Sequence, residues 1–328
     1  MKQQGFRYCS VCKNKLQRGS KTAAGKQRWQ CTSCATSSTR PRPDLSRGFV
    51  LERFVSWLLS KLAQSEREQA SRTFRDQTSW CWNVVPHYVL TGEIHHTIIV
   101  DGIRVGNSVC LIARTTHYVI AWVWVPYESS QYWVELFRLL PQPSYVVCDG
   151  QKGLLKALSI CWPTVIIQRC RFHAWLNIKT KLTLHPESIA GKELLKLTRD
   201  LLRLRTKRQA RRWKRRLKYW YRKHQEFVNE RTIKHDLKPR ERSWRYRHER
   251  LRSAYRQLHN ITDDLLCSSY RSNPELPSTT NHIEGGINSQ IRTKLKLHRG
   301  MPSAHQMRLV DWYLYTRTED QKPPRKCL

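Results

Sequence analysis

The sequence predicts an α/β fold, with a metal-binding module before it and a helical segment inserted into it. Two apolar runs that end in Asp-Gly have the β-branched composition of buried strands. Two Cys-x-x-Cys pairs lie near the N-terminus, and a long basic segment with helical periodicity lies in the second half. With 328 residues, the chain is long enough for one large domain or two to three small ones.

The charge of the chain is strongly positive. Its 60 Lys and Arg residues outnumber 25 Asp and Glu residues, which gives a formal net charge of +35. This balance indicates a polyanionic partner, most often nucleic acid, because phosphate contacts release counterions. A basic protein that is merely soluble is the weaker alternative, since uncompensated like charge destabilises a compact state.

The sequence also carries signals about location. It opens without the apolar segment of a signal peptide, and its most apolar run is too short to span a membrane. The cysteine number is odd, at 11, and four of these residues form a metal pattern. We therefore expect a cytoplasmic protein in a reducing environment, with no membrane partner.

Residues 1–45 predict a zinc ribbon. Two cysteine pairs are separated by 18 residues: Cys9, Cys12, Cys31 and Cys34. This spacing is typical of a single tetrahedral site in which four thiolates bind one structural Zn²⁺. Because such a small module has little apolar core, zinc binding would supply much of its folding free energy. A redox-active cysteine pair is the alternative, and the second pair argues against it.

Residues 46–96 predict a small helical region. Gly48–Gln64 has the apolar period of an amphipathic helix, and a second helix is expected to begin near Ser65. Two short helices with a basic second element suggest a helix-turn-helix in which Arg72 and Arg75 face DNA. A helical pair that serves only as a spacer is an equal alternative.

Residues 97–185, together with 278–320, predict the α/β core. The expected order is three strands, a helix, a strand, a helix and a last strand, with the strands at 97–101, 108–114, 118–125, 145–149 and 164–168. This is the order of an RNase-H-like fold, in which the first and fourth strands are neighbours at the centre of the sheet. The ends of those two strands would then bring Asp101 and Asp149 together.

A pair of carboxylates at one sheet edge suits two-metal phosphoryl chemistry, in which a third acid completes a site for two Mg²⁺. The alternatives are local: Asp149 could cap the following helix, and Asp101 could belong to an Asp-Gly turn. Because both acids fall at matching strand ends, the catalytic interpretation is favoured. Cys170 and His173 are expected to support this site, rather than to form half of a zinc site.

Residues 186–277 predict a helical basic insertion. Between Arg203 and Gln225 there are 12 Lys or Arg residues and no acid. A solvated helix face is the alternative, but so dense a cationic stretch favours a polyanion. We expect Arg211, Arg212 and Arg215 to contact DNA.

The last segment predicts a helix that begins at His282. Glu284, Asn288 and Arg292 lie on one stripe of this helix, which makes Glu284 a candidate third acid and Arg292 a candidate DNA contact. The two glycines after Glu284 would let a ligand come close. The pattern alone leaves an even alternative, in which Glu284 is the capping-box partner of Asn281.

These motifs resemble those of Mutator-type DDE transposases of bacterial insertion sequences, particularly members with an N-terminal zinc ribbon. The resemblance covers nearly the whole chain and depends on residues 27–31, 100–102, 148–150, 168–173 and, most specifically, 280–288. The family's Cys-x-x-His signature corresponds to Cys170 and His173. Its third acid, which follows a helical insertion, corresponds to Glu284.

The resemblance implies cut-and-join chemistry on double-stranded DNA. Asp101, Asp149 and Glu284 would hold two Mg²⁺, with Mn²⁺ as a substitute, and Cys170, His173 and Asn288 would support them. Hydrolysis at a terminal inverted repeat would free a 3′-OH, which would then attack target DNA. A homo-oligomer on DNA, associated with the bacterial nucleoid, is expected because two ends must be joined. The alternatives are a non-catalytic or domesticated DNA-binding protein and an RNase-H-like nuclease.

Overall fold

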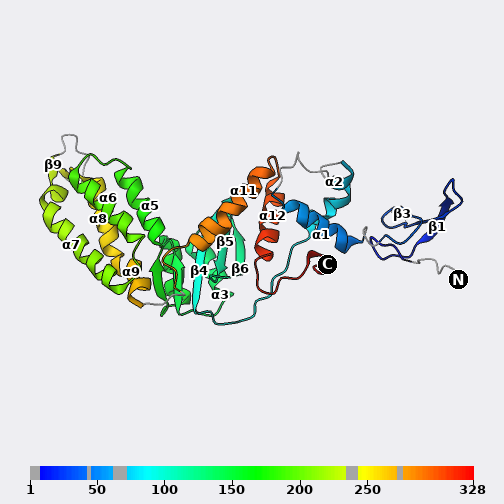
Figure 1. Cartoon of the computed structure of the whole chain (residues 1–328), viewed down its shortest axis with the longest axis horizontal. Coiled ribbons are helices and arrows are strands. Elements are labelled where there is room, and N and C mark those ends of the chain that lie inside the picture. The colour runs from blue at the N-terminus through cyan, green and yellow to red at the C-terminus, as the bar shows by residue number, and fades with distance from the viewer. Residues whose placement is uncertain (1–7, 43–45, 62–71, 234–242, 272–275) are drawn as a thin grey trace. The chain divides into compact units, whose positions relative to one another are not determined.

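The computed structural model describes residues 8–42, 46–61, 72–233, 243–271 and 276–328 (Figure 1). The chain divides into two compact units. The first unit combines Met1–Val89 with Gln290–Leu328, and the second unit is Leu90–Ser289. Residues 290–320 therefore pack with the N-terminal helices, whereas the sequence analysis grouped them with the α/β core.

A five-stranded mixed sheet forms the centre of the second unit. Its strands are β4 (Thr97–Val105), β5 (Ser108–Arg114), β6 (Val119–Val125), β7 (Tyr145–Cys148) and β8 (Ile166–Arg169). They lie in the order β6-β5-β4-β7-β8, with β4 antiparallel to β5 and parallel to β7. The predicted adjacency of the first and fourth strands of this sheet is confirmed.

The first of these strands does not end at Asp101, so that part of the prediction is wrong. Strand β4 continues to Val105 because its antiparallel pairing with β5 extends past Asp101, which is opposite Ile112. Its parallel pairing with β7 stops earlier, at Ile99 and Val147, and keeps a constant offset of 48 residues. Asp149 follows β7 with the same offset from Asp101, so the register brings these two acids level.

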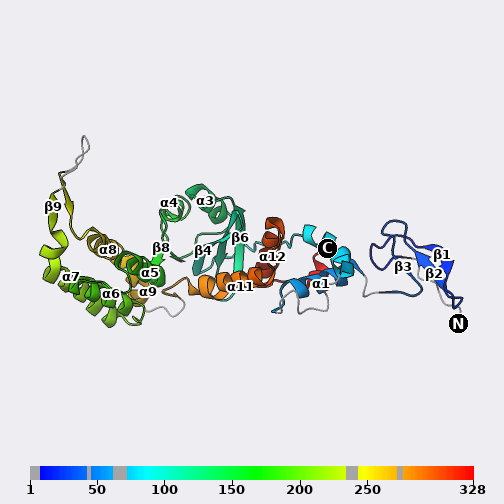
Figure 2. The same cartoon turned by 90° about the horizontal axis from the view of Figure 1, so that it is seen from above.

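Two helices, α3 (Ser130–Arg138) and α4 (Lys152–Cys161), lie together beside the sheet (Figure 2). Both helices were predicted, and α4 begins two residues after the expected start at Gly150. Their inner faces bury large apolar side chains, including Trp133, Phe137 and Leu154. Burial of these side chains fixes the loops that precede both helices against the edge of the sheet.

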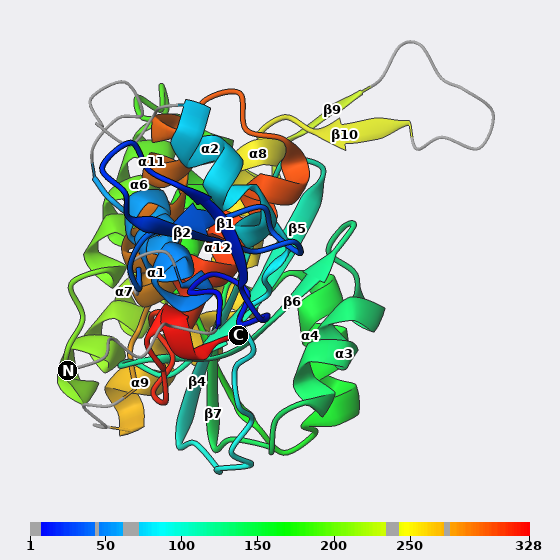
Figure 3. The same ribbon diagram turned by 90° about the vertical axis from the view of Figure 1, so that its right-hand side faces the viewer.

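The range predicted as a helical insertion, 186–277, contains α6 (Ile189–Leu201), α7 (Lys207–Asn229), α8 (Glu249–Asn260) and α9 (Thr262–Arg271). The helix α5 (Arg171–Leu182), in the range predicted as core, packs with them. One apolar cluster joins them, with Trp213 and Trp220 of α7 fully buried in it. The helix α7 begins with a capping box formed by Thr206 and Gln209, as its sequence indicates. A hairpin of β9 (Arg231–Ile233) and β10 (Trp244–Tyr246), absent from the prediction, extends from the helices (Figure 3).

The first unit begins with a three-stranded sheet of β1 (Gln17–Lys21), β2 (Gln27–Gln30) and β3 (Ser37–Ser38). Its helices are α1 (Arg47–Leu58), α2 (Arg72–Thr78), η4 (Ser79–Asn83), α11 (Ser289–Leu297), α12 (Ser303–Tyr315) and η6 (Pro324–Lys326). Aromatic rings form much of the helical core, with Phe54 edge-on to Trp82, and Trp57 edge-on to Phe74. The predicted start of the second helix at Ser65 lies outside the described residues.

In the described part of the chain, no helix combines the length and apolar character needed to cross a membrane.

Candidate active site and metal centre

The three predicted acids belong to three separate elements of the second unit. Asp101 lies within β4, Asp149 follows β7, and Glu284 begins a π-helical segment, η5 (Glu284–Asn288). Asp149 and Glu284 both act electrostatically on Asp101, so the fold brings the three carboxylates into one neighbourhood. The helical insertion lies between the second and third acid in the sequence, after α4 and β8.

Asp101 is a largely buried acid with a raised pKa. Burial raises its pKa to about 7, and the negative charges of Asp149 and Glu284 add to the shift while His173 opposes it. The backbone N–H of Gly102 donates a hydrogen bond to Asp101 Oδ1 at 3.0 Å. A buried carboxylate that two other carboxylates repel is stabilised as an anion by a bound cation, so this donor set fits a divalent metal ion.

Asp149 also makes the local interaction that its sequence position allows. Its Oδ1 accepts a hydrogen bond of 2.9 Å from the backbone N–H of Gln151, which is the N-cap residue of α4. This bond uses one carboxylate oxygen. The local role and a role in the acidic group are therefore compatible.

Glu284 is positioned by the chain that precedes it. A one-turn helix, α10 (Asn281–Ile283), begins after Thr280, and buried Arg114 of β5 donates a hydrogen bond of 2.8 Å to the carbonyl of His282. At Gly285, a Cβ atom would collide with the side-chain oxygen of Asn281. This glycine makes room for Asn281, which differs from its predicted purpose of admitting a ligand.

The predicted Cys-x-x-His pair contacts the segment that carries Glu284. Cys170 caps α5, and its sulfur accepts a hydrogen bond of 3.3 Å from the backbone N–H of Thr280. His173 Nε2 lies 3.2 Å from Glu284 Oε2. Burial alone would lower the pKa of His173. The Cys170 sulfur and the carboxylates of Glu284 and Asp101 outweigh burial and raise this pKa to about 9. At neutral pH the imidazolium therefore forms an ion pair with Glu284.

Asn288 connects the π-helical segment to the first acid. Its Nδ2 donates a hydrogen bond of 3.2 Å to Asp101 Oδ2, and the residue is only 1% exposed. Its Oδ1 is buried without a hydrogen-bond partner in the described structure. A buried amide oxygen without a partner is costly, and it is also a ligand that hard cations accept.

Sequence reasoning missed one acid beside this group. Glu128 lies in the loop between β6 and α3, and its carboxylate packs against the backbone of Gly102, the residue after Asp101. Burial raises the pKa of Glu128, and the charge of Asp149 raises it further. The sequence signal that could have identified Glu128 was its position shortly after the third strand of the sheet, which ends at Val125.

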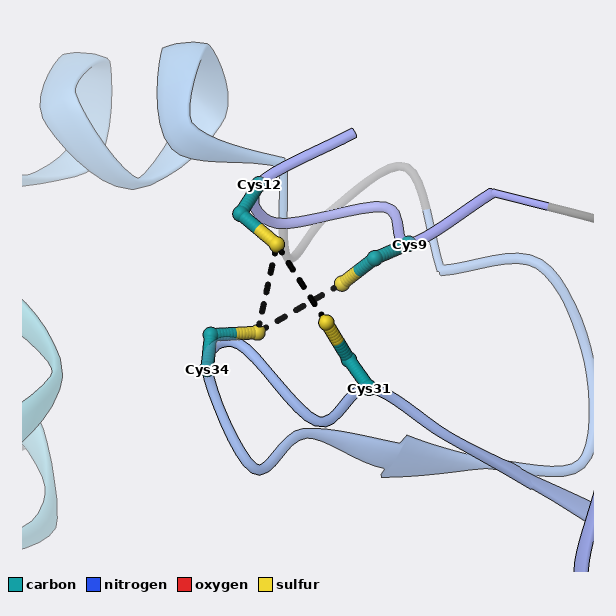
Figure 4. A group of neighbouring side chains, drawn as sticks. All are labelled: Cys9, Cys12, Cys31 and Cys34. Atoms are coloured by element: carbon teal, nitrogen blue, oxygen red, sulfur yellow. Dashed lines mark hydrogen bonds between the residues drawn. The ribbon is translucent and has the colours of Figure 1, made fainter. Parts of the chain in front are cut away.

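The four predicted zinc ligands form the tightest group of potential metal ligands. Among the described residues, they alone bring three or more such atoms within 4.8 Å of one another (Figure 4). The Sγ atoms are 3.6 Å apart for Cys9 and Cys34, and 3.4 Å apart for Cys12 and Cys31. Tetrahedral Zn–S bonds of about 2.3 Å put sulfur atoms roughly 3.8 Å apart. The site is therefore consistent with structural zinc.

The cysteines of this site differ in how readily they ionise. Burial raises the pKa of Cys31, but backbone N–H groups of Cys34 and Ser33 and the Cys12 side chain outweigh it and lower the pKa to about 6. Burial raises the pKa of Cys12 to about 12 and also raises that of Cys9, although the N–H of Val11 donates to Cys9 Sγ at 3.3 Å. A thiolate is thus favoured at Cys31, and zinc binding would have to deprotonate Cys9 and Cys12.

The candidate DNA contacts are exposed in both units. Arg211, Arg212 and Arg215 are exposed on α7, and Arg72, Arg75 and Arg292 are exposed in or near the helical part of the first unit. The basic stretch of α7 is not wholly uncompensated, as the sequence alone suggested. Three of its cations pair with acids on α6 and α9, in the pairs Lys214–Asp263, Arg216–Asp200 and Lys223–Glu193.

Two comparisons with known proteins bear on this arrangement. The profile of the family described as "Transposase, Mutator family" matches residues 115–321, which is more than half of the chain. The matched range contains Asp149, Cys170, His173 and Glu284, whereas Asp101 and the four-cysteine site precede it. No curated protein matches the chain.

Proposed function

This chain belongs to the Mutator family of transposases, and we propose that it cuts and joins DNA through a DDE-type active site formed by Asp101, Asp149 and Glu284. The single observation that carries this proposal is the convergence of the three acids: burial, and after it repulsion by Asp149 and Glu284, raises the pKa of Asp101 to about 7. The proposed core has the RNase-H-like fold, for which the sheet order β6-β5-β4-β7-β8 is the main support.

The three carboxylates would hold Mg²⁺, or Mn²⁺ in its place. Bound metal ions supply activation of the attacking oxygen and charge stabilisation of the leaving oxygen in an in-line displacement. The chain contributes the rigid frame. The register of the parallel strands β4 and β7 fixes the positions of Asp101 and Asp149 relative to each other. Such positioning accounts for much of the rate of phosphoryl transfer.

Supporting residues fix the orientation of two of the acids. The ion pair with His173 holds the Glu284 carboxylate, and the hydrogen bond from Asn288 fixes one oxygen of Asp101. Cys170 and Thr280 in turn hold His173, since Thr280 Oγ1 lies within 3.4 Å of both the Cys170 sulfur and His173 Nδ1. These contacts leave the three acids as the groups that face the metal.

DNA is the proposed partner. The exposed arginines Arg211, Arg212 and Arg215 of α7 would bind backbone phosphates, and the net charge of +35 would strengthen association. The proposed domains are a zinc ribbon (1–45), a helical DNA-binding region (46–96), the catalytic core (97–185 and 278–289) and the basic insertion (186–277). Residues 290–320, predicted as core, are left out because they pack with the first unit. We further propose a homo-oligomer on DNA in the bacterial cytoplasm, since joining needs two ends.

The test is Asp101→Asn in the full chain, assayed with oligonucleotides that carry the inverted repeats flanking the gene. We expect Mg²⁺-dependent cleavage and strand transfer to be lost and binding of the repeats to be retained. The exposed acid Glu135 of α3 provides a matched control, and Glu135→Gln should leave both activities unchanged. A variant at Asp101 that still cuts its repeats refutes the assignment.

The same assay separates the alternative functions. A non-catalytic DNA-binding protein would bind repeats without Mg²⁺-dependent products. An RNase-H-like nuclease would give cut products without joined ones. Joined products from the wild-type chain are expected, and they would exclude both alternatives.

A further inference from the structure

Two polar side chains at the junction of β8 and α5, Gln168 and Arg171, have no part in the proposed chemistry. Both are fully buried, at 0% exposed. The Arg171 guanidinium donates hydrogen bonds of 2.8 Å to the carbonyl of Leu265 and 2.7 Å to the hydroxyl of Ser269. Gln168 Nε2 donates to the same carbonyl at 3.1 Å. The junction is therefore bonded to α9, the last helix of the insertion.

The guanidinium of Arg171 also reaches a second part of the insertion. Its Nη1 donates at 2.8 Å to the carbonyl of Leu204, in the connection between α6 and α7, and its Nη2 donates at 3.1 Å to Ser268 Oγ. All four acceptors in the described structure are neutral. A buried cation among neutral acceptors is costly, and in some proteins such a group is kept because it specifies one arrangement.

The same junction holds the chain that returns from the insertion towards the third acid. The backbone N–H of Arg171 donates to the carbonyl of Ser278 at 3.0 Å. The sulfur of the adjacent Cys170 accepts the hydrogen bond from the backbone N–H of Thr280. The carbonyl of Thr280 in turn accepts a hydrogen bond of 3.0 Å from the backbone N–H of Glu284. Successive points along this chain are thus fixed to one junction, and the last of them is bonded to the third acid.

We propose that Arg171 is a positioning residue for Glu284. Its side chain fixes the insertion against the start of α5, and this sets the point at which the returning chain brings the third acid to the sheet. Gln168 supports the same attachment. The inference rests on the proposed function, in which Glu284 binds metal together with Asp101 and Asp149. Arg171 acts on the acid only through the chain that it holds.

Two serine variants separate this role from general attachment of the insertion. Ser269→Ala removes one acceptor of the Arg171 guanidinium. The control is Ser253→Ala on α8, because Ser253 Oγ accepts a hydrogen bond of 2.6 Å from Lys181 Nζ, which also belongs to α5. Each variant removes a hydroxyl that joins the insertion to α5. Only Ser269 is bonded to the residue that holds the returning chain.

The first measurement is Mn²⁺ binding to the full-length protein, with its thiolates first loaded with Zn²⁺ and free Mn²⁺ followed by electron paramagnetic resonance. Hard Mn²⁺ prefers carboxylates to thiolates, so the titration reports on the acidic site. We expect Ser269→Ala to weaken binding by about threefold and Arg171→Lys by about tenfold or more, because one ammonium cannot replace the planar fork of donors. Ser253→Ala should bind Mn²⁺ as the wild type does.

The second measurement is Mg²⁺-dependent cleavage of repeat DNA. A displaced third acid should lower kcat by about tenfold or more in Arg171→Lys and leave KM for DNA unchanged. The double variant with Ser269→Ala should lose no more than Arg171→Lys alone, because both changes break the same contact. If Arg171→Lys does not fold, Ser269→Ala decides the question.

Two results overturn the inference while the proposed function stands. One is wild-type Mn²⁺ affinity and kcat in Ser269→Ala. The other is an equal loss in Ser253→Ala, which would show that these bonds only attach the insertion. If the wild type binds no Mn²⁺, or if Asp101→Asn binds it as the wild type does, the proposed metal site fails and the inference fails with it.

Discussion

Asp101→Asn is expected to stabilise the folded protein at alkaline pH in the absence of added Mg²⁺, although it abolishes the proposed chemistry. The substitution removes a buried negative charge that Asp149 and Glu284 repel. It keeps an oxygen that can accept the hydrogen bond from Asn288 Nδ2. The wild-type carboxylate therefore lowers stability, which is the trade expected of a group kept for the proposed metal binding.

The magnitude follows from the pKa of Asp101, which burial raises from 3.8 to about 7. Between these pH values the folded state keeps a proton that the unfolded state loses, so stability falls as pH rises through this window. Each pKa unit corresponds to about 1.4 kcal/mol, so the full cost above pH 7 is about 4 kcal/mol. Near pH 5 the cost is only about 2 kcal/mol, and below pH 4 it vanishes.

The assay is urea denaturation of wild type and Asp101→Asn between pH 5 and pH 8, followed by tryptophan fluorescence. We expect the free energy of unfolding of the variant to exceed that of the wild type, by a margin that grows with pH. Added Mg²⁺ should stabilise the wild type and leave the variant unchanged. A variant less stable than the wild type at pH 8, or a margin independent of pH, refutes the reasoning.

Two further predictions concern the zinc site and the basic helix. The full chain, purified untagged under reducing conditions, should contain one zinc ion. The variant Cys31→Ser should lose this ion, and its N-terminal module should unfold. An elemental analysis that finds no zinc in the wild type contradicts the assignment of the zinc site. Replacing Arg211, Arg212 and Arg215 of α7 by glutamine should reduce the slope of log affinity for DNA against log salt by up to about 2.7. Arg216→Gln, which removes a cation already paired with an acid, should change the slope less; equal changes per residue would contradict the assignment.

The succession of strands in the sheet could be predicted because each strand contains a short apolar run. Asp101 and Asp149 followed from that pattern, since their level is set by the register of two adjacent strands. The continuation of β4 beyond Asp101 escaped prediction because it depends on pairing with β5, which is a long-range interaction. The sequence shows how strongly each residue favours an extended backbone. It does not show which neighbouring strand will pair with that residue and lengthen its strand.

Glu128 and Arg114 escaped prediction for a related reason. Neither residue belongs to a motif, and each contacts backbone that is distant in sequence. Arg114 donates to the carbonyl of His282, and Glu128 packs against Gly102. The ion pairs of α7 were missed because the compensating acids lie on other helices. Glu284 needed a family resemblance, because its helical pattern fits a capping role equally well.

The separation of the third acid in sequence has a consequence for the protein during its own synthesis. Asp101 and Asn288, which share a hydrogen bond, are 187 residues apart. A ribosome adds roughly 5–20 residues per second, so a nascent chain carries the first two acids for several seconds before Glu284 is made. Until the helical insertion folds and returns the chain to the sheet, the site lacks one of its acids. Under the proposed function, an unfinished chain that already carries its basic segments would bind DNA without the means to cut it.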